Sequence, residues 1–133
     1  MWKRIAIEFA AVGFAYGAKE VLRGVSFTVK GGQFVGIVGP NGAGKSTVLK
    51  LMDRLLSPST GEVRIMGRDI AGYTLSELAR LVALIPQEPE YFPFTVREMV
   101  RLGRTPYRRG FSPFSARDEE IVEQSMQEAG VLD

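Results

Sequence analysis

The sequence predicts an α/β fold in which an antiparallel β layer precedes a partial parallel sheet with flanking helices. Two observations support this fold class. Residues 1–32 contain only strand-like patterns, whereas strand and helix patterns alternate after residue 33. A glycine-rich loop also separates a short apolar run, residues 34–39, from the first helical pattern. The chain of 133 residues is 45% hydrophobic and 24% charged, which is sufficient for a buried core.

The first layer is predicted from alternating residues. Residues 4–10 alternate apolar and polar side chains, which is the period of a half-buried strand. A turn is expected at 16–19, and a second strand over 21–29 ends at the Gly31-Gly32 turn. The run at 34–39 is apolar throughout and predicts a strand that is buried on both faces.

The rest of the chain is predicted to alternate between helices and strands. A helix is expected over 45–56, a strand over 61–67, and a short helix within 75–87 that runs into a strand over 82–86. Thr95 is positioned to cap the next helix.

The last helix has a start and a stop signal. Ser115 and Asp118 stand in capping-box positions, and Gly130 is expected to end the helix. Its predicted inner face consists of Ile121, Val122, Ser125, Met126 and Ala129.

Composition excludes several classes of function. The sequence contains no cysteine and no histidine, so disulfides, thiolate metal sites and imidazole bases are ruled out. Lysine and arginine exceed aspartate and glutamate by only 17 to 15, which does not favour a nucleic-acid partner. No apolar run is long enough to span a bilayer, and the N-terminus does not have the pattern of a signal peptide. A cytoplasmic protein is the simplest expectation.

The stretch GPNGAGKST, residues 39–47, fits the phosphate-binding pattern G-x-x-x-x-G-K-[ST]; we call it the phosphate loop. Its glycines let successive N–H groups converge on phosphate oxygens, and the following helix directs its positive end at the same anion. Lys45 is expected to reach the β- and γ-phosphates, and the Ser46 hydroxyl to bind Mg²⁺. The other residues expected to contact the nucleotide are Gly39, Pro40, Asn41, Gly42, Ala43, Gly44 and Thr47.

The phosphate loop alone does not distinguish kinases, GTPases, helicases and transport ATPases, but its surroundings do. Residues 16–52 place an aromatic residue, a Val-Leu strand and a glycine turn before the loop. STGEVRIMGRDI (59–70) follows the first helix, and ARLVALIPQ (79–87) ends in glutamine. With these segments in this order, nearly the whole chain resembles the nucleotide-binding subunit of ATP-binding cassette (ABC) transporters, which are P-loop NTPases.

The resemblance implies ATP and Mg²⁺ as ligands and assigns two further residues. Tyr16 corresponds to the aromatic residue that stacks on adenine, and a flat ring suits that role. Gln87 corresponds to the glutamine that gives an amide oxygen to Mg²⁺ or to the attacking water and that couples the site to a membrane partner. Catalytic roles then fall to Lys45 and Gln87, and metal binding to Ser46 and Gln87. Without the resemblance, Tyr16 would be interpreted as an ordinary half-buried tyrosine at a strand end, and Gln87 as an ordinary solvated glutamine at a strand end.

The same resemblance implies features that are missing. The family's Leu-Ser-Gly-Gly signature is absent, and Gly31-Gly32 is a turn. Asp53 and Asp69 follow apolar stretches, but neither precedes a glutamate, and there is no switch histidine. The chain is therefore expected to be an N-terminal part that binds ATP without hydrolysing it efficiently. Its expected divisions are a β layer at 1–32, a core from the phosphate loop to the glutamine at 33–95, and the start of a helical subdomain at 96–133.

Residues 98–133, with the turn LGR-x-P before an acidic helix, resemble the subfamily that serves importers of iron-siderophores, haem and vitamin B12. This implies a homodimer of ATPase subunits, transmembrane permease subunits, an indirect partnership with a periplasmic or surface substrate-binding protein, and a place at the cytoplasmic face of the membrane. Five arginines form either a solvated face or a docking surface for the permease or for acidic lipid headgroups. They are Arg97, Arg101, Arg104, Arg108 and Arg109.

Three alternatives remain open. One is a soluble ABC-type ATPase of DNA repair or chromosome maintenance, although the long insertion expected after the glutamine is absent. Another is a different P-loop enzyme, such as a small-molecule kinase or a GTPase, which the strand-only first layer with Tyr16 argues against. The third is a domain that only binds nucleotide. The transported substrate is not encoded in this kind of subunit, because the permease and the binding protein select it.

Overall fold

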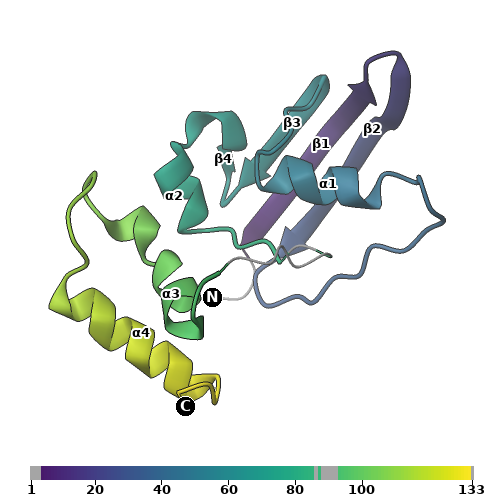
Figure 1. Cartoon of the computed structure of the whole chain (residues 1–133). Coiled ribbons are helices and arrows are strands. Elements are labelled where there is room, and N and C mark those ends of the chain that lie inside the picture. Colours follow the sequence, from purple (N-terminus) through teal and green to yellow (C-terminus); the bar gives the residue numbers. More distant parts are fainter. Residues whose placement is uncertain (1–3, 86, 88–92, 133) are drawn as a thin grey trace. The chain divides into compact units, whose positions relative to one another are not determined.

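The computed structural model describes residues 4–85, 87 and 93–132. The chain forms two compact units, Met1–Ala83 and Leu84–Asp133 (Figure 1). The first unit contains the sheet and the phosphate loop, and the second is helical. The division at residues 32 and 95 that the sequence predicts stays a prediction.

The first unit contains a sheet of four strands in the order β2-β1-β3-β4 (Figure 1). β1 (Ile5–Tyr16) and β2 (Lys19–Lys30) form a long antiparallel hairpin, as the alternating pattern predicts. β3 (Thr60–Ile65) pairs antiparallel with the other edge of β1, and β4 (Arg68–Asp69) pairs antiparallel with β3. The predicted strand at 61–67 therefore belongs to the antiparallel layer.

The helix α1 (Lys45–Met52) covers one face of this sheet (Figure 1). Its Val48 and Leu51 are buried in one cluster with Phe9, Val12 and Val63 of the sheet. Burying each such side chain contributes about 1.5–3 kcal/mol, so this contact fixes the helix on the sheet. The helix ends before the predicted residue 56, because the chain turns at Arg54, which adopts a φ of 62°.

Two short helical elements follow β4 and complete the first unit. They are the 3-10 turn η1 (Ile70–Gly72) and the helix α2 (Leu75–Ala79). Thr74 and Glu77 form a capping box at the start of α2, and Ile70 and Leu78 join the core.

The predicted strand at 34–39 is wrong for this structure. These residues form no strand, and Phe34 and Val38 are 101% and 92% exposed. The predicted strand at 82–86 is likewise not formed over 82–85, and Pro86 lies outside the described residues. A strand needs a neighbour for its N–H and C=O groups, and the part of the chain that the structure describes provides none beside either segment. The α/β class and the antiparallel layer are confirmed, but no parallel pairing occurs among the described residues.

The second unit contains α3 (Val96–Leu102), the 3-10 turn η2 (Thr105–Tyr107) and α4 (Ala116–Glu128). Both predicted caps are confirmed. Thr95 forms a capping box with Glu98 at the start of α3, and Ser115 forms one with Asp118 at the start of α4. Of the predicted inner face of α4, Val122 and Met126 are buried, whereas Ser125 and Ala129 are exposed.

Arginine side chains hold the two helices of this unit together. Arg104 Nε donates to Asp118 Oδ1 at 2.9 Å, and Arg101 Nη1 lies 3.4 Å from Glu119 Oε1. The guanidinium groups of Arg101 and Arg108 also lie over the Phe114 ring, at 5.2 and 4.4 Å from its centroid. Most of the arginines that the sequence offered as a basic surface are therefore engaged within the unit.

Among the helices of the described residues, none is both long enough and apolar enough to cross a membrane.

The Asp118 carboxylate makes the stability of this unit depend on pH. Hydrogen bonds from the Ser115 hydroxyl and N–H, and then the bond from Arg104, lower the pKa of Asp118 from its usual 3.8 to about 2. Because the folded-state pKa is depressed, the stabilisation is complete above about pH 4 and is lost as the pH falls through about 2.

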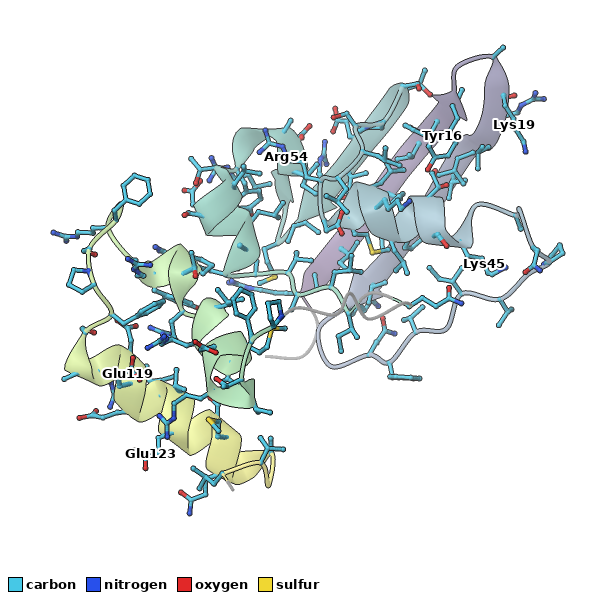
Figure 2. All side chains as sticks on the ribbon, in the orientation of Figure 1. Tyr16, Lys19, Lys45, Arg54, Glu119 and Glu123 are labelled. Atoms are coloured by element: carbon cyan, nitrogen blue, oxygen red, sulfur yellow. The ribbon has the colours of Figure 1, made fainter. Side chains whose placement is uncertain are left out.

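We expect Asp118→Asn to lower the melting temperature of the helical unit at neutral pH, and the difference from the wild type to shrink towards pH 2. Circular dichroism melts across this pH range would measure both. Glu123→Gln, at an exposed position on the same helix (Figure 2), is the matched control and should melt like the wild type. A difference between Asp118→Asn and the wild type that is equal at both ends of the range would contradict the assignment.

Candidate nucleotide-binding site

The phosphate loop turns sharply between the irregular segment 34–39 and α1. The Ala43 N–H donates to the Pro40 carbonyl at 3.2 Å and closes the turn. Gly42 and Gly44 adopt φ values of 82° and 89°, in the left-handed region where a side chain is strained. These two glycines are therefore required by backbone conformation.

Gly44 is also required by space, because it lies directly against β2. A Cβ atom at this position would be 2.7 Å from Leu22 Cδ2 and 3.2 Å from Val21 Cγ1. Leu22 is 5% exposed and packed in the core, so it has little room to move away. The last turn of the phosphate loop is thus seated on the hairpin.

The end of the loop presents positive charge. α1 begins at Lys45, and its N-cap, Gly44, supplies no capping side chain, so the first N–H groups of the helix are left for another acceptor. The Lys45 ammonium reaches back over the loop and donates to the carbonyls of Gly39 and Pro40, each at 2.7 Å (Figure 2). Loop N–H groups, the helix N-terminus and this cation together can hold a phosphate chain.

The two hydroxyl residues at the start of α1 differ in access. Thr47 is 5% exposed and packs into the core side of the helix, whereas Ser46 is exposed. Mg²⁺ prefers oxygen ligands and usually keeps several waters beside one or two protein oxygens and substrate phosphates. Ser46 fits this ligand set. The described residues form no cluster of three or more acidic side chains that could hold the ion alone.

Tyr16 ends β1 at the tip of the hairpin, where it pairs with Lys19 (Figure 2). Its side chain is half exposed, and its ring meets that of Phe14 in a T-shaped contact with centroids 4.9 Å apart. The exposed ring is available to a planar ligand, and the buried neighbour keeps it in place.

Gln87 belongs to the second unit and is exposed. Pro86 and residues 88–92 lie outside the described part of the chain. The predicted role of Gln87 in the site stays a prediction.

Sequence reasoning missed three residues that shape the site. Val21 and Leu22 support Gly44, and Phe14 supports Tyr16. Their apolar character predicted strands, but it does not reveal which loop packs on which strand.

The sequence pattern of the ABC transporter family matches residues 22–133. The chain belongs to the ABC transporter ATP-binding family. The hemin import ATP-binding protein HmuV of Methylobacillus flagellatus is 40% identical over 95% of the chain. The iron(3+)-hydroxamate import ATP-binding protein FhuC of Bacillus subtilis is 32% identical over 92% of it.

A solved structure agrees with this membership. A bacterial Atm1-family ABC exporter with ATP bound matches 100% of the chain with a TM-score of 0.74 and 34% identity. The chain spans 46% of the length of each of the two relatives and 22% of the exporter chain. The match therefore covers only part of these proteins, and the activity, substrates and partners of the whole protein are proposals.

We expect Gly44→Ala to destabilise the first unit by about 2 kcal/mol or more, because it combines a left-handed φ with a clash against Leu22. Gly36→Ala is the control, since a Cβ there meets nothing within 4 Å. Urea unfolding of both variants would measure the effect. Equal stability of the two variants would show that the loop is not seated on β2 as described.

Proposed function

We propose that the phosphate loop binds ATP, and that the chain is the first part of an ATP-binding subunit that couples ATP binding and hydrolysis to transport. The observation that carries the proposal is the junction of the loop with α1, where left-handed glycines, an uncapped helix N-terminus and the Lys45 side chain all lie within residues 42–45, with the Lys45 ammonium bonded back to the Gly39 carbonyl. Family membership supports the same ligand.

Each residue then has a role. The Lys45 ammonium exchanges the carbonyls of the loop for the β- and γ-phosphates, and Ser46 holds Mg²⁺, which when bound neutralises charge on the phosphate oxygens. Tyr16 stacks on the adenine, and Gln87 supplies an amide oxygen to Mg²⁺ or to the attacking water. The loop N–H groups contact the phosphates; they come from Gly39, Asn41, Gly42, Ala43, Gly44 and the start of α1.

We further propose that the transported substrate is a metal chelate, such as siderophore-bound iron, haem or cobalamin, and that transport is inward. The names of the hemin and hydroxamate relatives and the segment after LGR-x-P support this class. The subunit would work as a homodimer beneath transmembrane permease subunits, at the cytoplasmic face of the membrane, with a substrate-binding protein outside. Exposed Arg109 and Phe111 of the second unit offer a surface for the permease or for lipid headgroups. No feature favours the DNA-repair, kinase or GTPase alternatives.

Lys45→Ala is expected to abolish measurable Mg-ATP binding while the chain remains folded, because it removes the positive charge beside the loop. Titration calorimetry would measure the affinity. Lys50→Ala, an exposed lysine in the last turn of the same helix, is the matched control and should bind like the wild type. Unchanged affinity in Lys45→Ala would refute the phosphate loop as the binding site.

The chain of 133 residues alone is expected to bind ATP without sustained turnover. Phosphoryl transfer requires a positioned water and acidic metal ligands as well as the phosphate loop, and the described residues offer no such acidic cluster. A phosphate-release assay would test this expectation. Strong Mg-dependent hydrolysis that disappears in Lys45→Ala would show that the necessary groups are already present.

A further inference from the structure

We propose that Phe14 is a positioning residue for the nucleotide, which sets the distance between the Tyr16 ring and the phosphate loop through Leu22. The inference rests on the proposed ATP function and deepens it. ATP has a limited reach between its base and its phosphates, so a stacking ring and a phosphate loop must be held at a suitable separation to bind both ends.

A row of packed side chains joins Tyr16 to the phosphate loop, and its first link is the contact between the rings of Tyr16 and Phe14. Tyr16 and Phe14 are two positions apart on β1, and their rings meet edge to face at 4.9 Å. Tyr16 is 47% exposed, whereas Phe14 is 9% exposed and belongs to the core cluster. The buried ring is fixed by its surroundings, and it therefore limits the orientations open to the exposed one.

The second link crosses the hairpin. Phe14 is the register partner of Leu22 on β2, and side chains at such partner positions lie on one face of the sheet. Leu22 is also the side chain nearest to the position that a Cβ of Gly44 would take, at 2.7 Å. Tyr16, Phe14, Leu22 and Gly44 thus form a continuous packed row from the proposed adenine platform to the end of the phosphate loop.

The row lies within the first unit. Figure 2 labels Tyr16 near the tip of the hairpin and Lys45, the residue after Gly44, at the start of α1. A change at Phe14 should loosen the ring without altering the phosphate loop, since Gly44 rests on Leu22 and Val21 rather than on Phe14. A Phe14 variant should therefore lose affinity for the base and keep its affinity for the phosphates.

The test compares Phe14→Leu with Phe9→Leu. Phe9 is also a buried phenylalanine of β1, 2% exposed, but its ring stacks on Phe27 instead of on Tyr16. Calorimetry would measure the affinity of each variant for ATP and for inorganic tripolyphosphate, which has the phosphates without the base. We expect Phe14→Leu to weaken ATP by about fivefold, within the range for loss of base stacking, and to leave tripolyphosphate unchanged. Phe9→Leu should change neither affinity.

Further variants keep the proposal falsifiable. Phe14→Tyr keeps an aromatic ring against Tyr16 and should bind ATP like the wild type. Phe14→Met takes the place of Phe14→Leu if the latter does not fold. Equal ATP affinity in the Phe14 and Phe9 variants, or a parallel loss of ATP and tripolyphosphate in Phe14→Leu, would overturn the proposal. Failure of the wild type to bind ATP would instead refute the proposed function, and unchanged ATP affinity in Tyr16→Ala would refute the proposed stacking role of Tyr16.

Discussion

The site depends on the close contact between Gly44 and the hairpin. Gly44 can lie on Leu22 and Val21 only because it has no side chain, and the same residue turns the chain into α1 with a left-handed φ. This contact places the helix start and the Lys45 ammonium relative to the sheet. Val48 and Leu51, on the buried face of α1, then pack against the sheet and fix the helix on it. The position of the phosphate loop therefore follows from the core packing of the helix that it precedes.

Local patterns in the sequence predicted the elements that are stabilised locally. The turn of the β1–β2 hairpin, the start of α1 and the helix caps at Thr95 and Ser115 each depend on residues a few positions apart, and each is confirmed. The segment 34–39 has the composition of a buried strand, but a strand is completed by hydrogen bonds to a neighbour. Composition does not provide that neighbour, and the described residues do not place one there, so the prediction fails at this segment.

The site was predictable to a similar degree. The residues of the phosphate loop follow from a pattern whose physical reason is local, since a phosphate needs converging N–H groups and a cation. The support beneath the loop, from Leu22, Val21 and Phe14, joins segments distant in sequence, and apolar side chains give no sign of their partners. The arginines show the same limit, because their number suggested a basic surface although Arg104 and Arg101 are paired with acids on α4.

The two hydrogen bonds from Lys45 to the carbonyls of Gly39 and Pro40 have a consequence for how a ligand enters. The ammonium already has acceptors, and the loop already has its curved shape. An arriving phosphate would replace carbonyl oxygens as the acceptor without having to order a disordered segment. Much of the conformational entropy of assembling the site is therefore lost when the protein folds, which is the advantage of a preorganised receptor.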